Sequence, residues 1–167
     1  MSSNNKIRLK SKLIPTTLWL LIIIWLVLIF FLSSQSGVQT AKVSGEVAQS
    51  VAEIIYKQPT NEQVNQVHLN IRTIAHIVLF FVLGILSYTA LKTTFRNKNK
   101  QWLVWLISLA ICLGYSYYDE WHKQFIAGRH FQINEAVINM LCSIVGILTA
   151  FAVFLLVAKI KKIRSAK

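Results

Sequence analysis

Four long apolar segments divide the chain of 167 residues, and they restrict the folds that are open to it. They cover residues 13–32, 74–91, 102–118 and 135–158. A helix of about 20 apolar residues crosses the roughly 30 Å of hydrocarbon in a bilayer. Hydrophobic residues make up 54% of the chain and charged residues only 14%, which does not fit a soluble domain. The sequence therefore predicts one all-α integral membrane domain over residues 1–167, with four transmembrane helices.

The charges are distributed unevenly between the segments that join the apolar runs. The chain has 18 basic and 6 acidic residues. Thirteen of the basic residues lie before the first run, between the second and third, or after the fourth, where there is no acid. The positive-inside rule then places both termini in the cytoplasm. Basic tails that meet anionic headgroups explain the net charge of +12, so membrane lipids are expected partners and nucleic acid is not.

The segment between the first two runs, about 40–72, is too long for a tight turn and is expected outside the cell. Its apolar residues recur at helical spacing, which predicts an external amphipathic helix. Pro59 ends that helix, and Thr60 with Gln63 has the spacing of a capping box that opens a second helix leading into the next span. The amphipathic helix either lies on the outer leaflet as a lid over a site or packs on the bundle; its pattern fits both.

Polar residues gather at the expected outer ends of all four spans. Arg72 and His76 are four residues apart and share a helix face, as do Glu135 and Asn139. An unpaired charge even shallowly in a membrane costs on the order of 2–3 kcal/mol, so these groups are expected to pair and to line one mouth. The candidate binding residues are Gln35, Arg72, His76, Asp119, Glu120, His122, Gln124, Arg129, Glu135 and Asn139.

Several chemistries fit this set of residues. The arginines can hold a phosphate, pyrophosphate or carboxylate group through paired N–H donors. Histidine and carboxylate can transfer a proton, which makes His76, Asp119, Glu120 and His122 the catalytic candidates. The same four residues are possible zinc ligands, but the chain has no HExxH or CxxC spacing, so no metal or other cofactor is expected. The remaining interpretation is a structural network in which Arg72 and Arg129 neutralise the three acids.

Four motifs in order resemble the VanZ-like family of small bacterial membrane proteins. Phe31 to Gln35 resembles the family's F-S-S-Q, and Arg72 to His76, followed by Leu83-Gly84, resembles its R-K-x-x-H...L-G. Asp119 to Arg129 is similar to its D-E-x-H-Q-x-F-x-P-G-R. In the fourth motif, Glu135, Asn139 and Gly146 stand where the family has an acid, Asn or Asp, and Gly. Lys123 replaces the usual glutamine of the third motif and adds a cation to the expected site.

The resemblance implies a multi-pass protein of the bacterial plasma membrane with an outward-facing polar site. The family is named after an accessory protein of glycopeptide-resistance clusters, so the implied role is teicoplanin-type resistance or the handling of cell-envelope lipids and precursors. The implied partners are a lipid-linked cell-wall precursor or a lipoglycopeptide. Two alternatives stay open: a membrane-embedded hydrolase or transferase acting on a lipid-linked headgroup, and a non-catalytic helix-packing or partner-binding module.

Overall fold

A computed structural model describes residues 3–34, 37–95, 98–127 and 129–166, with side chains for 13–34, 45–95, 99–127 and 129–166. These residues form helices and no strand, so the all-α prediction is confirmed. The elements are α1 (Ser3–Ser33), α2 (Gly37–Tyr56), α3 (Asn61–Thr94), the short 3-10 helix η1 (Lys98–Lys100), α4 (Gln101–Lys123) and α5 (Ile133–Ser165).

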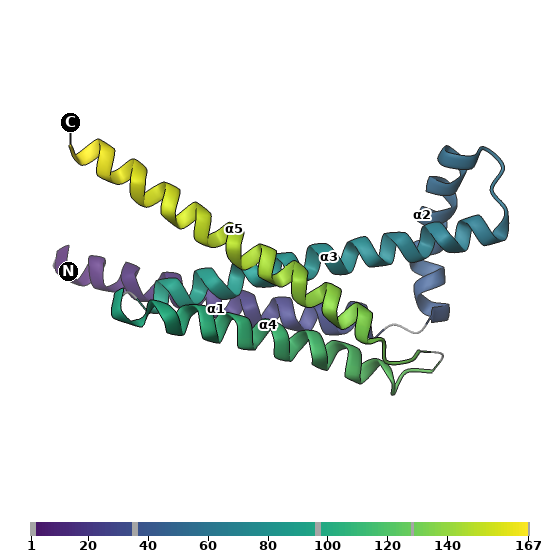
Figure 1. The fold of residues 1–167 in the computed structure, drawn as a ribbon, viewed down its shortest axis with the longest axis horizontal. Helices are drawn as coiled ribbons and strands as arrows, with labels where there is room; N and C mark the ends of the chain where they lie inside the picture. The colour runs from purple at the N-terminus through teal and green to yellow at the C-terminus, as the bar shows by residue number, and fades with distance from the viewer. Residues whose placement is uncertain (1–2, 35–36, 96–97, 128, 167) are drawn as a thin grey trace.

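Helices α1, α3, α4 and α5 run lengthwise, each antiparallel to the next along the chain (Figure 1). Both termini lie at one end of this bundle, and α2 lies at the other end, where it crosses α3 (Figure 1). Helix α5 diverges from the other three helices toward its C-terminus (Figure 1). Helix α3 is the central element, because it packs against α1, α2, α4 and α5.

Three of the described helices are long and apolar enough to cross a membrane: Leu13–Ser33 within α1, all of α3, and all of α5. The predicted spans 13–32, 74–91 and 135–158 fall in these helices. The predicted span 102–118 lies in α4, which does not qualify, so the expected count of four is corrected to three. Length is not the reason, since the 23 residues of α4 reach about 34 Å. The reason is composition, because polar serines and tyrosines dilute its apolar residues.

The boundary between α2 and α3 forms as the sequence predicts. Thr60 is the N-cap of α3, and its Oγ1 accepts a hydrogen bond from the Gln63 backbone N at 3.3 Å. The Gln63 side chain accepts one from the Thr60 backbone N at 2.9 Å, which completes the capping box. From there α3 continues for 34 residues, about 50 Å. The second external helix and the second span are therefore one continuous helix.

Two glycines let α3 and α5 approach each other closely. A Cβ on Gly84 would overlap the backbone oxygen of Ser143, and a Cβ on Gly146 would overlap that of Phe81. The backbones of the two helices therefore come into contact at the crossing. Small residues allow the same close approach in pairs of membrane helices. The sequence placed both glycines in the family pattern, and the structure gives the physical reason for them.

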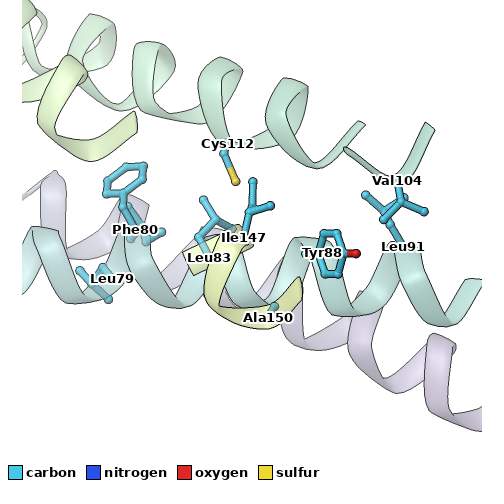
Figure 2. Packing of buried hydrophobic residues seen from close by; sticks show 10 residues of the cluster. Leu79, Phe80, Leu83, Tyr88, Leu91, Val104, Cys112, Ile147 and Ala150 are labelled. Atoms are coloured by element: carbon cyan, nitrogen blue, oxygen red, sulfur yellow. The ribbon is translucent and has the colours of Figure 1, made fainter. Parts of the chain in front are cut away.

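The apolar core surrounds α3. Leu83 of α3, Cys112 of α4 and Ile147 of α5 are buried and point into one space (Figure 2). Toward the end that carries the termini, the buried ring of Tyr88 packs against Trp105, with the ring centroids 5.3 Å apart. These contacts join α3, α4 and α5 into a common packing unit.

Helix α1 is fixed to this unit by aromatic side chains. Trp25 Nε1 donates to the Leu79 carbonyl oxygen of α3 at 2.9 Å. Tyr115 of α4 donates its hydroxyl to the Leu26 carbonyl oxygen of α1 at 2.5 Å. Buried hydroxyl and indole groups usually find such partners. All four lengthwise helices therefore meet in one bundle.

Helix α2 packs on α3 through small residues. Ala48 and Ala52 are fully buried against Val67, with Val64 and Ile71 beside them. This contact bears out packing on α3, one of the two interpretations of the amphipathic segment. It also fixes α2 beside the N-terminal part of α3, next to the residues described below.

Candidate functional site

A buried lysine binds three carboxylates at the end of the bundle nearest α2. Lys123 Nζ lies 3.3 Å from Asp119 Oδ2 and 3.1 Å from Glu135 Oε2, and it also donates to Glu120. Asp119 and Glu120 precede Lys123 by four and three residues on α4, which places all three on one face. Glu135 comes from the first turn of α5. These four residues are called the Lys123 cluster.

The burial of this cluster makes its pairing important. Asp119, Glu120 and Lys123 are each no more than 1% exposed. A buried ion left without its partner is strongly destabilising, by about 3–5 kcal/mol, whereas a satisfied pair costs little. Lys123 therefore joins α4 to α5 and allows three acids to lie together.

The expected neutralisation of the acids by Arg72 and Arg129 is corrected in one respect: in the described part of the chain both arginines lie near enough for their charges to act on these acids, but neither makes a direct ion pair with them. Among the described residues, the basic groups within 4.0 Å of these carboxylates are Lys123 and, at 3.9 Å from Asp119 Oδ2, the His76 ring. Lys123 was recognised in the sequence as an added cation, but it was not placed among the site residues. Its i,i+3 and i,i+4 spacing from two acids was the signal that would have identified it.

Arg129 binds α1 instead. Its Nη1 donates to the Ser33 carbonyl oxygen at 2.5 Å, so it satisfies a carbonyl at the C-terminal end of that helix. The side chain is buried, and its Nε and Nη2 have no hydrogen-bond partner. Burial lowers the pKa of Arg129, and the nearby positive charge of Arg72 lowers it further. Arg129 thus fastens the segment between α4 and α5 to the end of α1.

His122 lies on the α1 side of α4. Its Nδ1 donates to the Asp119 carbonyl oxygen at 2.8 Å, and its Nε2 is 3.2 Å from Ser34 Oγ. Its ring stacks on Tyr118 at 5.9 Å and contacts Phe30 at 4.9 Å between centroids. Both nitrogens are occupied, so His122 is placed to hold α4 against α1.

A small pocket of about 40 Å³ lies between α3 and α5 beside the Lys123 cluster. We call it the α3–α5 pocket. The residues that line it are Leu69, Arg72, Thr73, His76, Glu135, Ile138 and Asn139. Four of these were predicted as site residues, and the i,i+4 pairs Arg72/His76 and Glu135/Asn139 face each other across it, as expected from their spacing.

The pocket contains polar groups that the protein leaves unpaired. Asn139 is 2% exposed and its Nδ2 has no hydrogen-bond partner. His76 Nδ1 has none either, although Asp119 lies behind it. Arg72 is half-buried and makes no ion pair within the described part of the chain. Buried polar atoms are normally satisfied, so these atoms mark a place for a further partner.

The other predicted site residues stay apart from this pocket. Gln124 is exposed at the end of α4, and Gln35 lies outside the described residues. Asp119 and Glu120 belong to the Lys123 cluster, and Arg129 and His122 bind α1, as described above. The described residues hold no group of three or more His, Cys, Asp or Glu side chains placed to bind a metal ion, so the zinc alternative gains no support.

Three described helices are apolar and long enough to span a membrane, and one end of the bundle holds buried charged residues. These are the features of a membrane protein. The family model VanZ/LLP1 matches residues 18–156, and the chain belongs to this family. The resemblance drawn from the four motifs is thereby confirmed. No curated protein and no solved structure matches the chain.

Proposed function

We propose that this chain is a multi-pass protein of the bacterial plasma membrane that binds an anionic, lipid-linked group at the α3–α5 pocket, facing outward. The ligand chemistry is a phosphate, pyrophosphate or carboxylate group attached to a lipid tail, as in a cell-envelope precursor or a teicoplanin-type lipoglycopeptide. The role that follows is glycopeptide resistance or the handling of such precursors.

The charge distribution supports the outward orientation. The acid-free basic segments flank the ends of α1, α3, α4 and α5 opposite the Lys123 cluster, and both termini lie at that end (Figure 1). Under the positive-inside rule this end is cytoplasmic. Helix α4 runs lengthwise beside α3 and α5 and packs against both of them (Figure 1).

The observation that carries the proposal is the unpaired arginine in the pocket. Lys123 already binds Glu135, the acid that lines the pocket, so the guanidinium of Arg72 keeps its donors for a ligand. The free Nδ2 of Asn139 adds a second donor. Charge-assisted bonds from arginine suit phosphate and carboxylate oxygens.

The size of the pocket restricts the mode of binding. A volume of about 40 Å³ holds roughly three water molecules or a few ligand oxygens. Only the terminal oxygens of a headgroup fit, and the rest of the ligand stays outside. The apolar side chains of Leu69 and Ile138 at the pocket are suited to the start of a lipid tail.

Binding of farnesyl pyrophosphate to the purified protein in nanodiscs tests the proposal. Arg72→Gln is expected to weaken binding at least tenfold, because a hydrogen bond to a charged group contributes about 1.5–3 kcal/mol. Lys57→Gln removes an exposed positive charge on the same side and serves as the matched control, with unchanged affinity expected. Equal binding of uncharged farnesol, or full affinity in Arg72→Gln, would contradict the proposal.

The same pocket favours an enzyme as the second candidate. His76 lines it, and the buried Asp119 carboxylate lies 3.9 Å behind Nδ1, an arrangement that resembles a general base with its orienting acid. Such distances often shorten when a substrate binds. Release of inorganic phosphate from a polyprenyl pyrophosphate by wild type, and its loss in His76→Ala, is the expected result. Active binding without any product in wild type would exclude this reaction.

A further inference from the structure

Helix α2 has more apolar surface than α3 covers. Ala48 and Ala52 are fully buried against α3. Val47, Ile54 and Ile55 are 53%, 83% and 58% exposed. Val47 and Ile54 are seven residues apart, which is two helical turns, so they form one strip along the helix.

The polar residues in the described part of α2 lie on a different face from this strip. Glu46, Gln49, Ser50 and Glu53 are all exposed there. Gln49 Nε2 donates to Glu53 Oε1 at 2.7 Å, so part of this face is satisfied within the helix itself. A helix with a polar face and an uncovered apolar strip is the type that lies in a membrane interface.

The position of α2 fits the same conclusion. It runs across α3 instead of along it (Figure 1), and it packs at Val67. Val67 is 27 residues from Thr94, about 40 Å along α3, whereas the hydrocarbon core is about 30 Å thick. If α3 ends at one edge of the core, α2 lies within about 10 Å of the other edge, at the level of the headgroups.

We infer that α2 is an interfacial helix that places Val47, Ile54 and Ile55 against membrane lipid. Lipid is the occupant because α2 lies between α1 and α3 in the chain, and both of these helices contain segments apolar enough to span a membrane. They hold α2 close to the membrane surface. The inference rests on the proposed membrane placement but not on ligand binding.

This anchoring has a consequence for the α3–α5 pocket. Helix α2 packs on Val64, Val67 and Ile71, and Leu69 and Arg72 of the pocket lie on the same stretch of α3. A helix held in the headgroup layer at this point fixes the depth of the pocket relative to the lipid surface. Headgroups are then presented to Arg72 at a constant height.

Nitroxide labels on single cysteines test the inference in proteoliposomes. Cys142→Ala provides the background, and the native Cys112 is retained because it is buried. Val47→Cys and Ile54→Cys are expected to collide more with oxygen, which enters lipid, than with a water-soluble nickel chelate. Gln49→Cys and Glu53→Cys are matched controls on the polar face and should show the opposite order.

Two results would overturn the inference. Greater nickel access at positions 47 and 54 would place the strip in water. Protection from both reagents would mean that protein covers it, for example a second copy of this chain. A label at Ile24, an exposed residue of the apolar part of α1, checks the membrane placement separately. If the label at Ile24 collides mainly with oxygen while the label at position 54 collides mainly with the nickel chelate, the membrane placement holds and only the interfacial helix is rejected.

Discussion

Replacing Gly84 with alanine is expected to force α3 and α5 apart. The new Cβ would overlap the Ser143 backbone oxygen and lie 2.9 Å from the Ser143 carbonyl carbon. Carbon pairs rest at about 3.5–4.0 Å, so α5 must move back by about 1 Å. The obstacle is backbone and not the end of a flexible side chain, which means that no rotamer change relieves it.

The expected loss of stability follows from two opposing effects. Overpacking of a core typically costs about 1–3 kcal/mol, and a backbone clash belongs at the upper end of that range. Alanine recovers up to about 1 kcal/mol of helix propensity relative to glycine. The net loss is therefore about 2 kcal/mol, or roughly 4–8 °C in the melting temperature of a chain of this size.

Thermal unfolding in detergent, followed by circular dichroism, measures this loss. Gly114→Ala on α4 is the matched control, because no heavy atom outside its own helix lies within 4 Å of its added Cβ. It should leave the melting temperature unchanged or raise it. Gly146→Ala should lower it as Gly84→Ala does, and the double variant should lose less than the two single losses together, since both report one crossing. A Gly84→Ala protein as stable as Gly114→Ala would refute the close crossing.

Three further substitutions test other contacts. Lys123→Met should lower the free energy of unfolding by about 3–5 kcal/mol, because three carboxylates lose their cation. Lys57→Met is the control and should change it little, so equal melting curves for the two variants would contradict the Lys123 cluster. Thr60→Ala should cost about 1 kcal/mol and speed amide hydrogen exchange in the first turn of α3, and unchanged exchange would argue against the capping box. Tyr115→Phe should cost about 1 kcal/mol in the same melting assay through the lost bond to Leu26, and no loss would mean that this bond adds nothing.

The features predicted from the sequence are those that depend on local pattern. Continuous apolar runs identified the spans in α1, α3 and α5, and the spacing of Thr60 and Gln63 identified the start of α3. The i,i+4 pair Arg72/His76 was placed on one face, and it lines the pocket. Each of these follows from helical periodicity within one segment.

The features that were missed depend on contacts between segments. The pairing of Lys123 with Glu135 of α5, and the bond from Arg129 to the end of α1, are decided by how these segments pack, and helical spacing does not report this. The family motif has glutamine at this position, so the resemblance implied no pairing role for Lys123. The predicted count of spans was wrong for a different reason: α4 is long enough to span, but its serines, tyrosines and tryptophans lower its mean hydropathy.

The central claim, that an anion binds between α3 and α5, is tested most directly by histidine NMR during a titration with farnesyl pyrophosphate. The chain has four histidines, and His76 alone of them lines the pocket, whereas His122 faces α1. The resonances of His76 are expected to shift on titration, those of His122 to stay in place, and Arg72→Gln to abolish the shift. A titration that leaves His76 unchanged, or that farnesol reproduces, would contradict the claim.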